Sequence, residues 1–272
     1  MLCNIAGAIK MFTAEIISIG NELLIGKTVN TNATWLARKL TLLGFSVRRI
    51  TTVPDEISEI VSAIREAISR GTKIIVTTGG LGPTFDDKTS EALAKALNRK
   101  WVINNEALEL VRKKYSSMGF EITEHRLKMA KMPEKAKPIP NPIGSAPGIL
   151  VEENNSLIIA LPGVPKEMKA IFEEYVESIL KKKGPNIVFY EDTLVLKGMP
   201  ESSLAPFLEQ AMKRTVKTYI KSHPKGSESK EPVIEIHITS SGKSLEEARK
   251  LVNEAKEIIK SLIKGKVDII EH

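Results

Sequence analysis

The sequence has a single cysteine, Cys3, among its 272 residues, so no disulfide bond can form within the chain. So little cysteine is typical of proteins that work in the reducing interior of a cell, and we therefore expect a cytoplasmic location. No apolar run approaches the ~20 residues that a membrane-spanning helix needs. The histidines are also few and scattered, without the spacing typical of a metal site. They are His125, His223, His237 and His272.

The chain is also poor in glutamine and in aromatic residues, while lysine, glutamate and isoleucine are abundant. Glutamine occurs once, and aromatic residues make up 5% of the chain. This composition favours a thermophilic source. The 42% of hydrophobic residues suffices for a full core, and the net charge of +7 suits anionic small molecules or nucleic acid. A lysine-rich solvated surface explains the same charge more simply.

Strands and helices alternate along the first part of the chain. Apolar, β-branched stretches predict strands, and amphipathic stretches that end near glycine predict helices. The predicted strands are 14–19, 45–53 and 73–78, and the predicted helices are 31–43, 56–70 and 87–98. This order indicates βαβ units. We therefore expect an α/β fold with a three-layer, mostly parallel sheet.

The middle of the chain predicts further helices and a hairpin. Residues 105–131 are expected to be helical with a break near Gly119. The proline-rich residues 133–147 predict either a long ordered loop or a strand flanked by turns. Residues 148–163 predict a β-hairpin that turns at Asn154–Asn155. An amphipathic helix is expected at 165–184.

The elements after Pro185 predict a second, smaller domain. Their order is β-α-β-β-α-β, which is typical of a ferredoxin-like α+β fold. We therefore divide the chain into an N-terminal extension at 1–12, a large domain at 13–184 and a small domain at 185–272. We expect translation to start at Met1 or at Met11; in the second case residues 1–10 would be an upstream extension.

Three polar segments each follow a predicted strand directly. They are residues 20–26 (GNELLIG), Pro54–Asp55, and residues 79–87 (GGLGPTFDD). The carboxyl ends of parallel strands lie at one edge of a sheet, and ligands bind in the crevice outside that edge. We therefore expect the three segments to meet in one site.

The glycines of the third segment indicate a place where the backbone meets an oxyanion. Gly79, Gly80 and Gly82 let backbone N–H groups approach a phosphate, and the following helix adds the positive end of its dipole. The segment is not a P-loop, and Phe85 stands where a dinucleotide fingerprint needs its last glycine. A tight strand-to-helix turn would need the same glycines.

Four carboxylates lie on these three segments, namely Glu22, Asp55, Asp86 and Asp87. Each has a simpler explanation, because Asp55 and one of the adjacent aspartates could cap helices, and Glu22 could belong to a first helical turn. Together they would repel one another unless a divalent cation lay between them. Oxygen ligands shared with a phosphate suit such an ion. We predict a divalent-metal site (Mg, Mn or Co) at Glu22, Asp55 and Asp87, with Asp87 facing the crevice.

Two further loops offer groups that bind anions. Residues 140–148 contain Gly144 and Ser145, and residues 161–168 contain Gly163 and Lys166. Ordinary turns and a solvent-facing lysine would give the same pattern. The predicted substrate-binding residues are Gly79, Gly80, Gly82, Thr89, Asn30, Gly144, Ser145, Gly163 and Lys166.

Four of these motifs together resemble a known family. They are GNELLIGKTVNTN (20–32), TTGGLGPTFDDKTSEAL (77–93), NPIGSAPGI (141–149) and LPGVPKEM (161–168). In this order they resemble the N-terminal module of CinA-type proteins, over a region from about Ala14 to Leu180. The wider superfamily contains molybdopterin adenylyltransferases and molybdenum insertases. The resemblance therefore implies a molybdopterin-binding-like fold.

The resemblance also implies roles for single residues. VPDE (53–56) and residues 77–89 are similar to the adenylyltransferase motifs, in which the acids matching Asp55 and Asp87 serve metal-dependent catalysis. Leu81 replaces a small polar residue of that motif, which argues against molybdopterin adenylylation. The CinA-type module is associated with metal-dependent hydrolysis of ADP-ribose, and this pyrophosphatase activity is the one we expect.

In the expected reaction, water attacks one phosphorus of a nucleotide diphosphate beside the metal ion. Asp86 is the predicted base, and Lys88 or Lys166 would stabilise the developing charge. The first alternative is a molybdopterin-binding or molybdenum-cofactor biosynthesis protein that uses the same crevice. It would bind a pterin phosphate instead.

The second alternative is a non-enzymatic nucleic-acid-binding module in the small domain. Its basis is the basic stretch from Lys213 to Lys225, with Tyr219 inside it. A GxxG loop of a KH domain and the paired aromatics of an RNA-recognition sheet are both missing, so nucleic acid is an unlikely partner. No membrane partner is expected, and we predict a homo-oligomer, either a dimer or a trimer.

Overall fold

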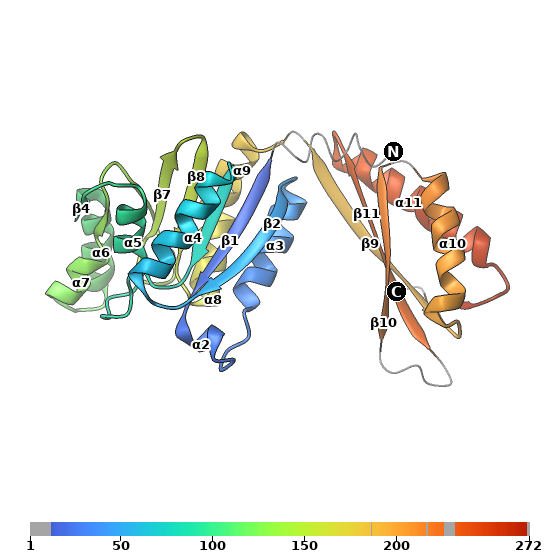
Figure 1. The fold of residues 1–272 in the computed structure, drawn as a ribbon, viewed down its shortest axis with the longest axis horizontal. Coiled ribbons are helices and arrows are strands. Elements are labelled where there is room, and N and C mark those ends of the chain that lie inside the picture. Colours follow the sequence, from blue (N-terminus) through green and yellow to red (C-terminus); the bar gives the residue numbers. More distant parts are fainter. Residues whose placement is uncertain (1–11, 186, 216, 226–231, 271–272) are drawn as a thin grey trace. The chain divides into compact units, whose positions relative to one another are not determined.

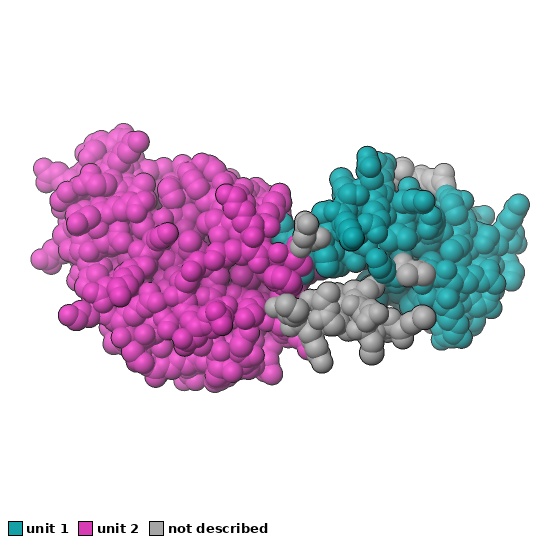
Figure 2. All heavy atoms as spheres, turned by 90° about the horizontal axis from the view of Figure 1, so that it is seen from above, with its two compact units in different colours: residues 1–6, 42–44, 186–272 teal, residues 7–41, 45–185 magenta. Residues whose placement is uncertain are grey.

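The computed structural model describes residues 12–185, 187–215, 217–225 and 232–270. The chain divides into two compact units, and the boundary between them falls after Pro185 (Figure 2). Each unit has its own sheet and its own hydrophobic core. Apart from Phe12, the predicted N-terminal extension lies outside the described residues.

The larger unit is built on a six-stranded mixed sheet in the order β2-β1-β3-β8-β7-β6 (Figure 1). Its strands are β1 (Thr13–Ile19), β2 (Ser46–Val53), β3 (Ile74–Thr78), β6 (Lys137–Ile139), β7 (Gly148–Glu153) and β8 (Ser156–Leu161). The pairs β2–β1, β1–β3 and β3–β8 are parallel, whereas β7 is antiparallel to both of its neighbours. This arrangement confirms the predicted α/β fold with a mostly parallel sheet.

Helices cover both faces of this sheet, so the unit has three layers (Figure 1). The helices are α3 (Thr31–Leu42), α4 (Ile57–Ser69), α5 (Thr89–Ala96), α6 (Asn105–Ser117), α7 (Glu124–Lys128), α8 (Pro165–Ile171) and α9 (Glu177–Lys183), with a π-helical turn at Phe172–Val176. Helix α3 packs against that turn through the rings of Trp35 and Phe172, whose centroids are 5.2 Å apart. Helices α4, α5 and α6 share the core beneath Ile17 and Ile75.

The central strands are apolar because both of their faces are covered. All five residues of β3 are buried, as the unbroken apolar run predicted. Within the described residues, no helix combines the length and the apolar character that crossing a membrane requires.

Several short elements differ from the prediction. Residues 21–24 form the short helix α2 (Asn21–Leu24), and β4 (Trp101–Ile103) pairs with β5 (Lys131–Pro133) in a separate two-stranded sheet. The segment 105–131 is broken near Gly119, as predicted. Elements of three or four residues are too short to show a period in the sequence, which explains why they were missed.

The smaller unit has the predicted β-α-β-β-α-β order. Its elements are β9 (Val188–Lys197), α10 (Glu201–Arg214), β10 (Thr218–Lys225), β11 (Val233–Gly242), α11 (Leu245–Ile263) and β12 (Asp268–Ile270). The sheet order is β10-β11-β9-β12, with every pair antiparallel. Both helices contribute to one core with the strands, for example Leu204 and Ile259 against Ile236. Residues 226–231, between β10 and β11, lie outside the described residues.

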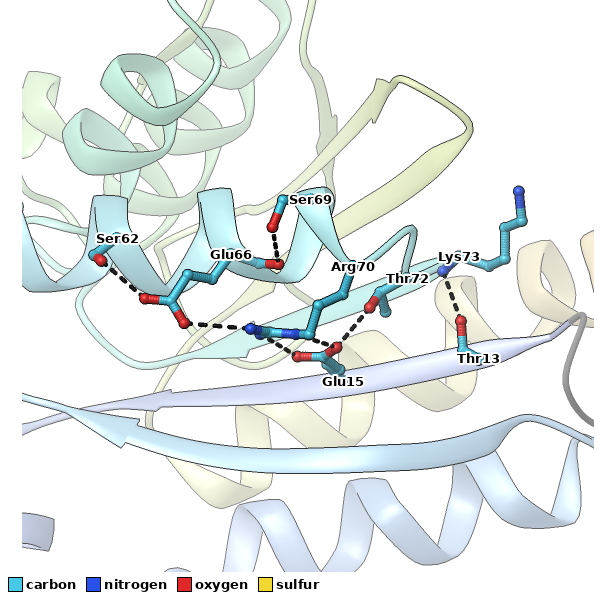
Figure 3. A network of polar contacts seen from close by, with 8 residues as sticks. All are labelled: Thr13, Glu15, Ser62, Glu66, Ser69, Arg70, Thr72 and Lys73. Atoms are coloured by element: carbon cyan, nitrogen blue, oxygen red, sulfur yellow. Dashed lines mark hydrogen bonds and ion pairs between the residues drawn. The ribbon is translucent and has the colours of Figure 1, made fainter.

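A buried carboxylate ties the central strand β1 to the end of α4 (Figure 3). Glu15 is 3% exposed, and its two oxygens accept hydrogen bonds from the Arg70 guanidinium at 3.0 and 2.7 Å. The Thr72 hydroxyl donates to the same carboxylate at 2.6 Å. This network links β1 to the segment between α4 and β3, at the edge of the sheet opposite the strand C-termini.

Candidate functional site

A cavity of about 400 Å³ lies outside the C-terminal ends of the parallel strands. Each of the four parallel strands contributes to its lining. The lining includes Gly20 after β1, Asp55 after β2, Gly79 and Gly80 after β3, and Gly163 after β8. The three segments singled out in the sequence therefore meet in one place, as the topology of a parallel sheet requires.

Two glycines let the strand ends approach closely at the base of the cavity. Gly79 has φ 110°, and a Cβ there would collide with the Ile19 carbonyl oxygen. A Cβ on Gly163 would lie 3.3 Å from the Gly79 Cα. The Gly79 N–H is already used, because it donates to the Leu161 carbonyl at 3.0 Å. These two glycines therefore serve close backbone packing, which leaves the other backbone groups of the loop to meet a ligand.

Four of the predicted substrate-binding residues do not line this cavity. Thr89 is fully buried, and its hydroxyl donates to the Gly79 carbonyl at 2.7 Å, so it holds the loop in shape. Asn30 caps α3 by accepting the Ala33 N–H at 3.1 Å. Gly144 lies beneath the Glu167 side chain, and Lys166 is exposed to solvent. Short polar and glycine residues at helix starts and turns give the same sequence signal whether they bind a ligand or the backbone.

The cavity is lined by acidic side chains. Five carboxylates reach it, and among its described lining residues there is no lysine, arginine or histidine. The five are Glu22, Asp55, Asp86, Asp87 and Glu167. The negative charge of this lining repels an anionic ligand unless a cation offsets it.

Asp55 is oriented by the neighbouring strand end rather than by its own helix. Its Oδ2 accepts the backbone N–H of Asn21 at 2.8 Å. The prediction that Asp55 caps the following helix is wrong, because α4 begins at Ile57 and its N-cap position is Glu56, without a side-chain hydrogen bond. The Asp55 contact therefore links the ends of β1 and β2 at the cavity.

Asp86 and Asp87 both line the cavity, and neither caps α5, whose N-cap position is Lys88. Asp87 accepts from the Thr84 N–H at 2.9 Å and from the Thr84 hydroxyl at 2.6 Å. The same hydroxyl lies beside Asp86, although it can donate to only one of them at a time. The Thr84 hydroxyl, the Asp86 backbone N–H and the charges of Lys128 and Lys88 hold the pKa of the Asp86 carboxyl below its ordinary value. These contacts favour the ionised form of the Asp86 carboxyl.

Comparison with known proteins identifies the larger unit. Residues 15–182 match the family model described as a probable molybdopterin binding domain, which is more than half of the chain. The chain belongs to this family.

Relatives and a crystal structure place the chain among the CinA-type members of the family, as the motifs predicted. The chain is 44% identical to CinA from Thermoplasma acidophilum, a protein described as of unknown function, whose crystal structure matches 61% of this chain and 97% of that one with a TM-score of 0.58. It is 53% identical over 253 residues to a Pyrobaculum aerophilum protein, covering 93% of this chain and 95% of that one. A Metallosphaera sedula protein is 46% identical over 265 residues, covering 96% and 99%.

The predicted metal ligands Glu22, Asp55 and Asp87 line the same cavity but do not form a preformed metal site. Within the described part of the chain, no group of three or more histidine, cysteine, aspartate or glutamate side chains is placed to hold a metal ion. The donor set nevertheless fits Mg²⁺ or Mn²⁺, which bind through one or two carboxylates and complete their shell with water and ligand phosphate. The described residues do not fit a metal site in which every ligand is a protein side chain.

Sequence reasoning missed one acidic residue of the site, Glu167. It lies in the first turn of α8, directly after β8, next to the lysine that was chosen instead. The signal was present, because side chains in the first helical turn after a parallel strand lie at the ligand edge of the sheet. What the sequence did not show is its partner Asn141, whose Nδ2 donates to Glu167 at 2.7 Å from another loop.

A second, larger hollow of about 510 Å³ lies at the opposite edge of the sheet, where β3 and β8 begin. Its charged lining is Lys73, Glu152, Glu153 and Lys183. Glu152 is paired with Lys183 at 2.6 Å and Glu153 with Arg99 at 2.6 Å. None of the motif segments reaches it, so we place the candidate site in the smaller, acidic cavity.

Proposed function

We propose that the larger unit binds a phosphorylated small molecule of the molybdopterin type in the acidic cavity, together with a divalent cation. The observation that carries the proposal is the lining itself, which joins five carboxylates to a glycine-rich base and, among the described residues, includes no basic side chain. Membership of a probable molybdopterin binding family supports the pterin ligand. In this proposal the cation and the phosphate occupy the cavity together.

Carboxylates of the cavity would bind the cation, and backbone N–H groups would bind the phosphate. Asp55 and Asp87 would hold the cation, since both line the cavity and both are oriented by hydrogen bonds from the backbone. A bound Mg²⁺ supplies positive charge that offsets the phosphate. Backbone N–H groups of the loop after β3 would then orient the phosphate oxygens. The apolar lining by Leu81, Met129 and Val164 suits a flat ring.

Hydrolysis of ADP-ribose is the second candidate. The observation in its favour is the excess of carboxylates, because five exceed the one or two that a Mg²⁺ ion uses. Water would add to one phosphorus and the bridging P–O bond would break, giving AMP and ribose 5-phosphate. A carboxylate of the cavity, Asp86 being the one expected from the sequence, would accept the proton of the water.

One ligand panel tests both candidates. The full chain is titrated in a calorimeter with a pterin phosphate and with ADP-ribose, each with Mg²⁺ or Mn²⁺, and the same mixtures are analysed for AMP and ribose 5-phosphate. Pterin-phosphate binding without product formation supports the first candidate, and release of both products supports the second. Binding of neither compound with any metal ion would overturn the proposal. Lys166→Ala is the matched control, because that side chain is exposed beside the site.

A further inference from the structure

Lys128 places a positive charge beside the acidic cavity. It is the last residue of α7 and directly precedes Met129, which lines the cavity. Its side chain is half-buried, and its Nζ donates a hydrogen bond to the Thr84 carbonyl in the loop after β3. Asp86 and Asp87 of the same loop line the cavity. A lysine 44 residues further along the chain thus reaches the loop that carries two of the five cavity acids.

The backbone around Lys128 is held in place by its neighbours. The guanidinium carbon of Arg126 on the same helix lies 4.3 Å from the centre of the Tyr115 ring. Ala130 is fully buried, and its carbonyl accepts the Asn104 N–H at 2.9 Å. The stem of a lysine side chain is flexible, so its ammonium group can change partner while the backbone stays where it is.

The hydrogen bond between Lys128 and the Thr84 carbonyl can be exchanged at low cost. The same carbonyl accepts the Asp87 N–H at 3.3 Å, so it keeps a donor when the lysine leaves. Thr84 is also exposed, so water can take the place of the ammonium group. Within the described residues Lys128 forms no ion pair. Its charge is therefore available to an anion that enters the cavity.

The charge of Lys128 already acts at the cavity. The Thr84 hydroxyl contributes most to the lowered pKa of the Asp86 carboxyl. The charges of Lys128 and Lys88 lower the same pKa further. Lys166 is exposed and has no hydrogen bond or ion pair within the described residues. Of these three lysines, Lys128 is the one whose ammonium group is hydrogen-bonded to the cavity loop.

We propose that Lys128 is a phosphate-binding residue, whose ammonium group moves from the Thr84 carbonyl to a phosphate oxygen when the ligand enters. The inference rests on the proposed function, because it needs a phosphorylated ligand in this cavity. A hydrogen bond from an ammonium group to a phosphate is charge-assisted and stronger than one to a neutral carbonyl. The new ion pair adds positive charge and so offsets part of the repulsion from the five carboxylates. The ligand is thereby limited to compounds whose phosphate lies at the side of the cavity formed by Met129 and the loop after β3.

Calorimetric titration of the full chain with a pterin phosphate and with ADP-ribose, each with Mg²⁺, tests this role. Lys128→Met removes the charge and keeps an unbranched stem, and we expect about ten- to hundredfold weaker binding, the range for loss of a hydrogen bond to a charged group. Lys128→Arg keeps the charge and should stay within about fivefold of the unaltered chain. Lys166→Met is the matched control and should change the affinity by less than about twofold, because exposed charges are well screened. Circular dichroism shows whether each variant is folded.

Amine labelling of the unaltered chain separates a contact with the ligand from a purely structural role. The chain is acetylated with an amine-reactive reagent, with and without saturating pterin phosphate or ADP-ribose, and the modified lysines are followed by mass spectrometry. We expect the bound compound to slow the acetylation of Lys128 several-fold and to leave Lys166 unchanged. If Lys128→Met does not fold, this measurement decides on its own.

The outcomes separate this inference from the proposed function. If Lys128→Met binds the phosphorylated compounds like the unaltered chain, the role of Lys128 is overturned while the proposed function stands. If Lys128→Met and Lys128→Arg are equally weak and the ligand does not protect Lys128 from acetylation, the lysine only holds the loop and the inference is overturned as well. If the unaltered chain binds neither compound, the proposed function fails and the inference fails with it.

Discussion

Asp87 accepts the Thr84 backbone N–H at 2.9 Å, and the Thr84 hydroxyl, which also lies beside Asp86, is 2.6 Å from the Asp87 carboxylate. These contacts turn the loop after β3 back on itself and hold the carboxylate over Gly82. A Cβ placed on Gly82 would lie 2.5 Å from the Asp87 Oδ2, closer than side-chain atoms tolerate. The Asp87 carboxylate can therefore occupy this position only because residue 82 is a glycine.

Gly82→Ala should weaken metal-dependent ligand binding, because the added methyl group displaces the Asp87 carboxylate. We expect a loss of about tenfold, the size typical of a disturbed metal ligand environment. The backbone at Gly82 is not in the left-handed region, so the melting temperature should change little. Calorimetric titration and a thermal melt measure the two quantities. An unchanged affinity would show that the position of Asp87 does not matter for binding.

For Asn30 we expect a change in stability and no change in ligand binding, because the structure places this residue at the N-cap of α3 and not in the cavity. Asn30→Ala should lower the free energy of unfolding by about 1 kcal/mol, the usual cost of a lost N-cap. Ligand affinity should not change. Asn30→Asp retains the side-chain acceptor for the Ala33 N–H and serves as the control. A variant that melts normally and has lost ligand binding would restore the binding role expected from the sequence.

At the scale of elements, the parallel strands and the position of the site could be predicted from the sequence. The apolar run of β3 and the polar segments after β1, β2 and β3 are local patterns, and the rules of parallel sheets bring their ends together. Long-range partners could not be predicted. Asp55 meets Asn21 from 34 residues away and Glu167 meets Asn141 from 26 residues away, and no pattern within either segment specifies those pairs.

The buried Glu15 network should make the stability of the larger unit depend on pH (Figure 3). Burial raises the pKa of the Glu15 carboxyl, but the hydrogen bonds from Arg70 and Thr72 and the Arg70 charge outweigh it, so the pKa lies below its ordinary value of 4.5. A lowered pKa in the folded state adds stability above the unfolded value. That contribution is lost as the pH falls through the lower, folded value.

Glu15→Gln should therefore cost about 2 kcal/mol at neutral pH, where a charged hydrogen-bonded pair is broken. The difference from the unaltered chain should shrink as the pH falls below about 4.5. Urea denaturation at pH 7, 5 and 3 measures it. Glu66→Gln is the control, because Glu66 pairs with the same arginine at 3.2 Å from an exposed position. A difference that stays constant down to pH 3 would contradict the linkage.

At the scale of the whole chain, the smaller unit carries the basic stretch that suggested nucleic acid. On β10, Tyr219 is 58% exposed, and Lys221 and Lys225 lie on the same side of the strand. Glu235 on the neighbouring strand pairs with Lys225 at 3.2 Å and lies 3.5 Å from His237. The pairing offsets part of the positive charge, so the nucleic-acid alternative rests on little beyond a few lysines.

The predicted homo-oligomer also belongs to this scale and stays a prediction. Ile25 and Val29 after β1 and Phe85 after β3 are 74%, 80% and 87% exposed, on loops that follow two neighbouring strands. Such large exposed apolar side chains favour burial in an interface. Light scattering of the unaltered chain should give a dimer or trimer, and the double variant Ile25→Glu, Val29→Glu should shift it toward the monomer. A monomer at every concentration would refute the prediction.

The central claim is that the acidic cavity binds a phosphorylated ligand only together with a divalent cation. Its most direct test is calorimetric titration of the full chain with a pterin phosphate, first with Mg²⁺ and then with excess chelator, repeated with Asp87→Asn. We predict binding with Mg²⁺, no detectable binding with chelator, and a loss of at least about tenfold for the variant. Equal binding with and without Mg²⁺, or full affinity in Asp87→Asn, would contradict the claim.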